Sequence, residues 1–288
     1  MRCEICQSTD VTNWATVSIY DYYRCRTCQY LYVYPKPSAG DLKKYYQDAE
    51  FYNKAESEES RLIAEAESRL QVLSRLVEKY RLKKCLLDVG CASGIFLEQA
   101  QKHRWLVEGV ELSPVLAAKA RRKGLNVMNG WIGGLPSNSK YPVVTAWEVI
   151  EHAIDPVKFL ENLRSCVQDG GLVALSTPLS NGLPARVLGS RFPMICPPEH
   201  ISLFSKQSIM MLGRRLGLEM IRFRSFSNLK KENLERGLFH IVFGPMAVPN
   251  SVGRKLSSLL AVAILPLPKL MDVMGLGSEM EIVFRCVP

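Results

Sequence analysis

The chain has 288 residues, enough for one α/β domain of ordinary size and a small second unit. Hydrophobic residues make up 47% of it and charged residues 23%, so composition excludes a disordered or fibrous protein. The net charge of +9 favours anionic partners without separating nucleic acid, phosphorylated metabolites and an anionic membrane surface. Residues 206–236 hold eight basic side chains against three acidic ones, and an ordinary solvated face explains this excess equally well.

The N-terminus and the apolar stretches bear on where the protein acts. The first ten residues, MRCEICQSTD, have neither the basic start nor the apolar core of a secretory signal peptide, so we expect a cytoplasmic protein. The most apolar stretch, residues 259–270, contains two prolines and a lysine. It is also shorter than the ~20 residues that span a bilayer, so we predict no transmembrane helix.

Four cysteines near the N-terminus form two C-x2-C pairs separated by 18 residues: Cys3, Cys6, Cys25 and Cys28. This spacing is typical of a zinc ribbon, in which two turns supply the four thiolates of a closed tetrahedral site. The alternative is two disulfides or a redox pair, but the expected cytoplasmic location favours zinc. We therefore predict a zinc-ribbon domain over residues 1–37, in which Zn²⁺ holds the fold and does no chemistry.

A predicted strand over residues 30–34 ends at two prolines, which mark a domain boundary. Residues 38–82 are predicted to form a linker followed by an amphipathic helix from Glu56 to Tyr80. Apolar residues recur there with helical period, with acidic residues at the front and Lys79 at the rear.

From residue 83 onward, short apolar runs alternate with helical stretches. Strands are predicted over 85–89, 106–111, 143–147 and 172–176, with helices that begin at Ile95, Pro114 and Asp155. This alternation predicts an α/β fold with a doubly wound, mainly parallel, Rossmann-like sheet over residues 83–240.

Residues 241–288 are predicted to form a C-terminal cap and an edge strand, the strand lying in the alternating run EMEIVFRCV. The apolar part before that run fits a cap over an acceptor pocket, a dimer face, a helix pair resting on a membrane, or plain core.

The first predicted strand continues into a glycine-rich turn and a helix, in LLDVGCASG followed by IFLEQA. Such a unit is typical of nucleotide binding, and we expect Gly90 and Gly94 to allow close approach of a ligand. Glu111, 21 residues beyond Gly90, is placed to accept both ribose hydroxyls. The turn reads G-x-A-x-G and not G-x-G-x-x-G, and Asp88 would repel a pyrophosphate but receive the ammonium of a methionine moiety. These features favour S-adenosylmethionine over NAD.

Taken together, DVGCASG, Glu111, AWEVIEHAIDP and GGLVALSTP resemble the class I S-adenosylmethionine-dependent methyltransferase family over about half the chain. VIEHAIDP, GGLVALSTP and PPEHISLFS resemble the branch of ubiquinone-type O-methyltransferases and of natural-product and surface-polysaccharide methyltransferases. The cysteine ribbon followed by YVYPKPS resembles zinc-ribbon-bearing members of that branch.

The resemblance implies a set of cofactor contacts: Asp88, Gly90, Ala92, Gly94, Glu111, Leu112, Gly130, Trp131 and Glu148. Two positions depart from the family pattern, because Ala92 replaces a frequent glycine and Pro142 stands where an acidic residue commonly opens the strand. The acidic residue that often faces adenine is also missing, so contact falls to Asn129, Gly130, Trp131 or Ile132, and Trp131 offers a stacking face.

Methyl transfer is an in-line displacement at a sulfonium carbon, so the enzyme aligns the acceptor and, for a hydroxyl, removes its proton. Two of the four histidines follow a glutamate: His152, after the strand over 143–147, and His200, after a Pro-Pro pair. We expect His152 first and His200 second as general base or acceptor-positioning group. A purely structural hydrogen bond to a loop or helix end is the alternative for each.

The sequence thus predicts a methyltransferase acting on a small-molecule acceptor, a hydroxyl of a sugar, nucleotide-sugar or biosynthetic intermediate that is anionic or phosphorylated. One alternative is an RNA methyltransferase whose ribbon grips phosphate, although Arg2, Arg24 and Arg26 are the ribbon's only cations before Lys36. The other is a non-catalytic adapter that retains a cofactor fold. Peripheral membrane contact stays open, and the oligomeric state is not predicted.

Overall fold

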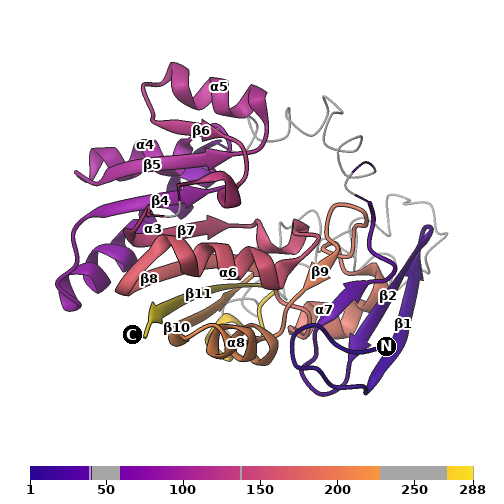
Figure 1. The fold of residues 1–288 in the computed structure, drawn as a ribbon. Helices are drawn as coiled ribbons and strands as arrows, with labels where there is room; N and C mark the ends of the chain where they lie inside the picture. Colours follow the sequence, from indigo (N-terminus) through magenta and orange to yellow (C-terminus); the bar gives the residue numbers. More distant parts are fainter. Residues whose placement is uncertain (39, 41–58, 137, 228–270, 288) are drawn as a thin grey trace, which may run out of the picture.

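The computed structural model describes residues 1–38, 40, 59–136, 138–227 and 271–287. They form a seven-stranded sheet and a four-stranded sheet. In Figure 1 the large sheet lies between two layers of helices. The small sheet, which includes the N-terminal strands, lies to one side of it, next to α7. Residues 41–58 of the predicted linker, residues 241–270 of the predicted cap and the boundary at residue 240 fall outside the described residues.

The large sheet has the strand order β6-β5-β4-β7-β8-β11-β10. Its first five strands pair in parallel, which confirms the predicted doubly wound α/β fold. The order reverses between β4 and β7, and such a reversal opens a crevice at the edge where the parallel strands end, called the carboxyl edge below. These strands are β4 (Cys85–Val89), β5 (Leu106–Glu111), β6 (Val127–Asn129), β7 (Tyr141–Trp147) and β8 (Val167–Pro178).

The other two strands of the large sheet are β10 (Leu218–Phe226) and β11 (Glu279–Cys286). β11 is antiparallel to both of its neighbours, β8 and β10. The EMEIVFRCV run therefore forms a strand as predicted, but it lies one position inside the sheet. β10 occupies the edge where we expected β11.

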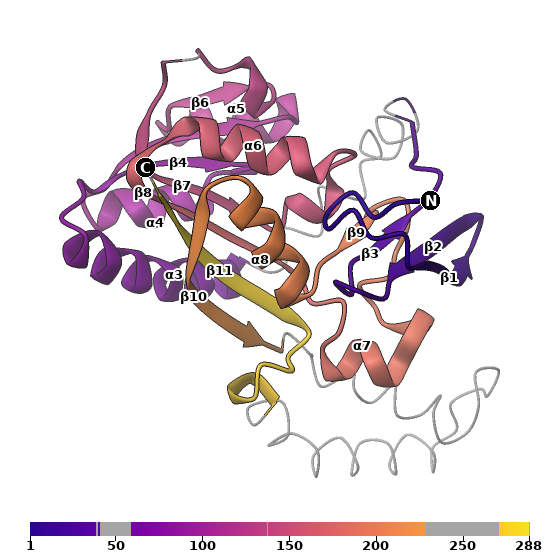
Figure 2. The ribbon, with the colours of Figure 1, turned by 60° about the horizontal axis from the view of Figure 1, so that its bottom comes forward.

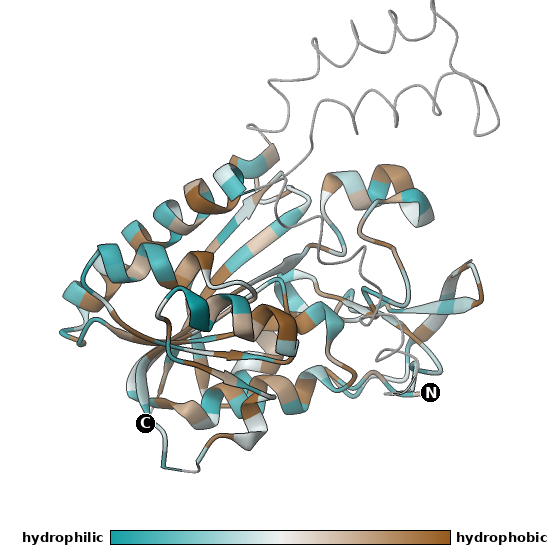
Figure 3. Cartoon of the chain, turned by 90° about the horizontal axis from the view of Figure 1, so that it is seen from above, coloured by the Kyte–Doolittle hydropathy of each residue, from teal (hydrophilic) through white to brown (hydrophobic). Residues whose placement is uncertain are grey.

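Helices cover both faces of the large sheet, and side chains alternate between the two faces along each strand. Leu86 packs in the layer of α3 (Glu59–Lys79), α4 (Ile95–Lys102) and α5 (Pro114–Arg122). Its neighbour Leu87 packs in the opposite layer, with α6 (Pro156–Cys166) and α8 (Lys206–Arg215). Figure 3 shows the helices alternating between hydrophilic and hydrophobic residues, as expected for elements with one buried side.

The small sheet joins the N-terminal strands to a segment from much later in the chain. Its order is β1 (Val11–Val17), β2 (Tyr20–Cys25), β3 (Leu31–Val33) and β9 (Ser202–Leu203). We call β1, β2, β3 and the cysteine turns the N-terminal module. Figures 1 and 2 both show it beside β9 and the short helix α7 (Leu183–Leu188).

The N-terminal module shares a hydrophobic core with the helix layer of α6 and α8. The Tyr30 and Phe204 rings lie 5.1 Å apart, between centroids. The Ser205 hydroxyl, fully buried, donates to the Cys28 carbonyl at 2.6 Å, and the Ser180 hydroxyl donates to the Gln29 carbonyl at 2.7 Å. The module is thus packed into the larger unit and not tethered beside it.

Among the described residues, none of the helices combines the length and the apolar character needed to cross a bilayer.

Substitution Ser205→Ala tests this docking. Ser205 also caps α8 by accepting from the Ser208 backbone N–H at 2.9 Å, so the substitution removes a helix cap and leaves the buried Cys28 carbonyl without its donor. We expect the free energy of unfolding to fall by about 2 kcal/mol in urea denaturation. Ser165→Ala, which removes an exposed hydroxyl, is the control. An equal effect of the two substitutions would contradict the docking role.

Candidate active site

The glycine-rich turn after β4 is fixed by packing within the protein. Gly90 and Gly94 have φ values of 75° and 81°, in the left-handed region that favours glycine. A Cβ atom on Gly94 would lie 2.3 Å from Leu125 Cδ1, and one on Gly90 would lie 2.6 Å from Val149 Cγ2. The backbone conformation and the neighbouring side chains therefore both require glycine at these positions, and the close approach of a ligand stays a prediction.

The Glu111 carboxylate lies against this turn and is held by backbone donors. Its Oε2 accepts from the Ala92 N–H at 2.9 Å, and its Oε1 accepts from the Ser113 N–H at 2.7 Å. Ala92 has a φ of 48°, which explains why glycine is frequent there. A carboxylate has about four acceptor sites, so each oxygen of Glu111 can accept one more hydrogen bond in a fixed direction.

Two large apolar side chains stand exposed beside Glu111. Leu112 is 69% exposed and Trp131 is 59% exposed. The Asn129 amide joins the two loops, because its Nδ2 donates to the carbonyls of Glu111 and Leu112 at 2.9 and 3.0 Å. A ligand with a flat base and a sugar fits such a surface, because the base can contact the apolar side chains while the two sugar hydroxyls donate to the carboxylate. Ile132 is only 4% exposed, so it offers much less surface than Trp131 for such a contact.

Asp88 is turned into the sheet. It is 2% exposed, and its Oδ1 accepts from the Thr145 hydroxyl of β7 at 2.6 Å. Burial raises the pKa of Asp88 to about 7, while the Thr145 hydrogen bond and the charge of Arg69 lower it. Thr145 thus holds one oxygen of this carboxylate, and its contact with the ammonium of a methionine moiety, directly or through water, stays a prediction.

Three acidic side chains lie close together beyond the end of β7. Glu148 has a φ of 53°, and its N–H donates to the Ser176 hydroxyl at 3.1 Å. Burial, and then the Glu148 charge, raise the pKa of Glu151 well above its ordinary value. The same two causes raise the pKa of Glu279, on β11, to about 9. Residues in sparsely populated backbone conformations are often functional, which is consistent with the prediction that Glu148 contacts the cofactor.

The structure brings together the two histidines that the sequence suggested as separate candidates. His152 ends the 3-10 turn η3 (Ile150–His152), and His200 precedes β9. Their ring centroids lie 4.9 Å apart with the planes at 66°. Burial, and then the His200 charge, lower the pKa of His152 to about 3, so its imidazole is neutral near pH 7. A group with so low a pKa is a weak general base, which favours the positioning role.

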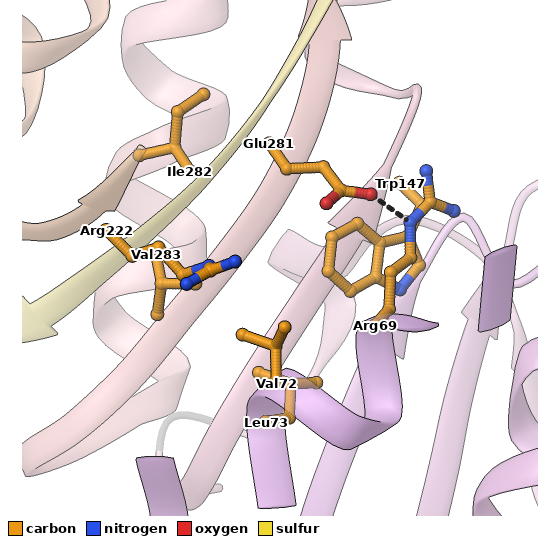
Figure 4. Close-up of a pocket in the computed structure, with 8 residues that line it drawn as sticks. All are labelled: Arg69, Val72, Leu73, Trp147, Arg222, Glu281, Ile282 and Val283. Atoms are coloured by element: carbon orange, nitrogen blue, oxygen red, sulfur yellow. Dashed lines mark hydrogen bonds and ion pairs between the residues drawn. The ribbon is translucent and has the colours of Figure 1, made fainter. Parts of the chain in front are cut away.

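Arg69, which the structure buries near Asp88, was not singled out in the sequence. It is 8% exposed on the inner side of α3, its Nε donates to Glu281 Oε1 at 2.9 Å, and its guanidinium lies 4.5 Å from the centre of the Trp147 ring. These residues line a small pocket with Arg222 and the α3 and β11 side chains (Figure 4). The signal in the sequence was the position of Arg69 in α3, where an arginine stands among the apolar residues of the buried side of the helix.

The four N-terminal thiols converge on one point. Cys3 Sγ lies 3.6 Å from Cys28 Sγ, and Cys6 Sγ lies 3.5 Å from Cys25 Sγ. All four sulfurs are within 4.8 Å of one another, and none of these cysteines forms a disulfide in the part of the chain that the structure describes. Four sulfurs bonded at about 2.3 Å to one tetrahedral Zn²⁺ would lie ~3.8 Å apart, so the arrangement fits such an ion.

Comparisons with known proteins agree with this geometry. A family model described as a methyltransferase domain matches residues 59–222. The mitochondrial ubiquinone biosynthesis O-methyltransferase of Schizosaccharomyces pombe is 29% identical over 56% of this chain and 60% of its own length. Ubiquinone biosynthesis O-methyltransferase of Coxiella burnetii (strain Dugway 5J108-111) is 30% identical over 33% of this chain and 43% of its own. The chain therefore spans about half the length of these relatives.

Among solved structures, a SAM dependent methyltransferase from Archaeoglobus fulgidus superposes with a TM-score of 0.53 at 16% identity. The match covers 83% of this chain and all of that one, and it shows a shared fold.

The pKa of Asp88 predicts how stability depends on pH. Its folded-state pKa of about 7 exceeds its ordinary value of 3.8, so the folded state binds the extra proton between these values. The stability of the wild type relative to Asp88→Asn should therefore be highest below pH ~4 and fall as pH rises to ~7. Urea denaturation across this range measures it, with exposed Asp169→Asn as control. A difference that does not change with pH would refute the assignment.

Proposed function

This chain belongs to the class I S-adenosylmethionine-dependent methyltransferase family, and we propose that it methylates a hydroxyl of a small-molecule acceptor. The acceptor class that we propose is a sugar, a nucleotide-linked sugar or a related biosynthetic intermediate. The observation that carries the proposal is the fixed Glu111 carboxylate beside exposed Leu112 and Trp131, after strands on one side of the reversal. His152 follows β7 on the other side of the reversal, and its ring lies 4.9 Å from that of His200.

The residues at the ends of β5 and β6 fit the adenosine half of the cofactor. Glu111 would accept the two ribose hydroxyls, Leu112 and Trp131 would contact the adenine faces, and Gly130 leaves the approach open, with only Met128 within 4 Å of an added Cβ. When bound, S-adenosylmethionine supplies a methyl carbon that bonds to the acceptor oxygen as its bond to sulfur breaks, sulfur keeping the electron pair. The protein's part is to exclude water, fix the acceptor oxygen in line and let its proton leave.

A hydroxyl acceptor is supported by the printed names of the matched relatives, which are O-methyltransferases. It is also supported by the neutral His152 imidazole, which can accept or orient a hydroxyl without adding charge to a site already rich in carboxyl groups.

We infer that Cys3, Cys6, Cys25 and Cys28 hold a structural Zn²⁺. Each cysteine turn ends in a glutamine with positive φ, Gln7 at 64° and Gln29 at 60°. The N–H of each glutamine donates to the carbonyl of the first cysteine of its turn, at 2.9 and 2.8 Å. The two turns therefore share one conformation, and each directs two thiolates at the common centre. Four protein ligands leave no position for water, so the ion would hold the fold.

The RNA alternative gains no support from the basic residues of 206–236 that the structure describes. Arg215 donates to the Glu4 carbonyl at 2.9 Å, Arg224 pairs with Glu281 at 3.6 Å, and Lys206 lies over the Phe223 ring. Each of these three side chains therefore has a contact within the protein.

The test of the function is transfer of label from isotopically labelled S-adenosylmethionine into a host extract that is then separated into RNA, polar metabolites and lipids. We expect label in the polar metabolites, with Glu111→Gln protein as the disabled control. Ribonuclease-sensitive label would replace the proposal with the RNA alternative. Binding of cofactor without label in any fraction would favour a non-catalytic adapter.

Substitution Glu111→Gln tests the ribose contact. The amide keeps the shape of the carboxylate but removes its charge and one of its two acceptor oxygens, so affinity for S-adenosylhomocysteine should fall ~10- to 100-fold. Isothermal titration calorimetry measures the loss, and Glu108→Gln, on the same strand, is the matched control because Glu108 accepts from Tyr141 away from the turn. Equal affinity of the wild type and Glu111→Gln would remove Glu111 from the cofactor site.

A further inference from the structure

We propose that the N-terminal module positions the acceptor side of the site, and that Tyr22 and Lys36 are its two positioning residues. Tyr22 holds the segment that carries His200, and Lys36 holds the segment that carries His152. The consequence for catalysis rests on the proposed function, whereas the effect on the place of the two imidazole rings does not.

The segment of His200 is folded onto the module. Residues 192–203 share a hydrophobic cluster with β2 and β3, to which the module contributes Tyr22, Leu31 and Val33. Within this segment β9 extends the small sheet beside β3 (Figures 1 and 2). The Val33 N–H also donates to the Ile201 carbonyl at 2.9 Å. Side-chain packing and backbone hydrogen bonds therefore both join this segment to the module.

The Tyr22 hydroxyl binds the backbone at His200 itself. It donates to the His200 carbonyl at 2.5 Å, and Tyr22 is fully buried. The ring of His200 is oriented within the same segment, because its Nδ1 lies 2.9 Å from the Met194 carbonyl oxygen. A carbonyl oxygen can only accept, so Nδ1 is the donor. Tyr22 thus fixes the backbone to which this imidazole is attached.

Lys36 reaches the segment that carries the other histidine. Its Nζ donates at 2.6 Å to the carbonyl of Ile154, which follows His152 closely in the chain. The same Nζ pairs with the Glu4 carboxylate at 2.7 Å, and the Tyr30 hydroxyl donates to that carboxylate at 2.7 Å. The Lys36 and Glu4 side chains are 21% and 27% exposed, so solvent screens this pair less than a fully exposed one. The module therefore holds Lys36 in place while Lys36 binds the backbone beyond η3.

The two segments are also joined to each other. The Ile201 N–H donates to the Glu151 carbonyl at 3.0 Å, and His152 Nδ1 lies 2.8 Å from the Glu199 carbonyl oxygen. Across this junction the rings of His152 and His200 lie 4.9 Å apart. The place of each ring therefore depends on both attachments to the module.

Both attachments start beside the cysteines. Tyr22 and Cys25 lie on the same strand, β2. Glu4, the partner of Lys36, lies within the first cysteine turn. The proposed Zn²⁺ would stabilise both attachments, because it fixes the two turns from which they start.

The cofactor side of the site has no such attachment among the described residues. Glu111 is held by the backbone N–H groups of Ala92 and Ser113. The hydrophobic cluster that includes side chains of α4 and α5 contains no residue of the module in the described part of the chain. A weakened attachment should therefore alter the acceptor side and leave the affinity for S-adenosylhomocysteine unchanged. This difference separates a positioning role from a general role in stability.

The test compares Tyr22→Phe and Lys36→Met in the full chain, using nuclear magnetic resonance of isotope-labelled histidine rings. The chain has four histidines, whose signals are assigned by substitution with Gln. We expect both variants to shift the ring signals of His152 and His200 and to leave that of exposed His103 in place. Label transfer to a fixed amount of the polar-metabolite fraction should fall ~10- to 100-fold, because a small misplacement of a positioning group is that costly. Isothermal titration calorimetry should show unchanged affinity for S-adenosylhomocysteine.

Tyr141→Phe and Lys140→Met are the matched controls, because each loses one hydrogen bond at the start of β7, at the opposite end of this strand from the histidines. The two test variants break different attachments, so one remains informative if the other does not fold. Unmoved signals of His152 and His200 in a folded test variant, or equal shifts in the controls, would overturn the proposal. A loss of S-adenosylhomocysteine affinity as large as the loss of transfer would also overturn it. Shifted ring signals in a protein whose wild type transfers no label would support the positioning role and count against the proposed function alone.

Discussion

The reversal of strand order between β4 and β7 is the constraint on which the rest of the structure depends. Parallel strands end at one edge, so residues that follow β4, β5, β6 and β7 in the chain meet along a single crevice. The turn with Gly90, the Glu111 carboxylate and Trp131 come from one side of the reversal. Glu148 and the turn that carries Glu151 and His152 come from the other side. The topology itself thereby separates the residues proposed to bind adenosine from those proposed to bind the acceptor.

The N-terminal module is joined to the domain that carries these residues, because the two share a hydrophobic core and the strand β9. β9 completes its sheet, and Ser205 and Ser180 satisfy carbonyls of its second cysteine turn. On its other side, Tyr22 reaches the backbone at His200. We therefore expect loss of the proposed zinc ion to alter the position of His200, on the proposed acceptor side of the site.

Local patterns in the sequence predicted most of the fold. β4, β5 and the starts of α4 and α5 lie at the predicted residues, because hydrophobic period and caps are short-range signals. Contacts between distant segments had no such signal. They include the position of β11 between β8 and β10, and the pairing of β9 with β3. They also include the contact of His152 with His200, which lie 48 positions apart in the chain. The burial of Arg69 is of the same kind, because its partner Glu281 lies on β11.

We propose that one site binds the cofactor at Glu111 and the acceptor at the histidines. A crystal structure of the full chain with S-adenosylhomocysteine measures it most directly. We expect the ribose on Glu111, the adenine on Leu112 and Trp131, and the sulfur directed toward the side of the crevice that carries His152. Adenosine bound away from the ends of β5 and β6, or a sulfur directed away from His152 and His200, would contradict the account.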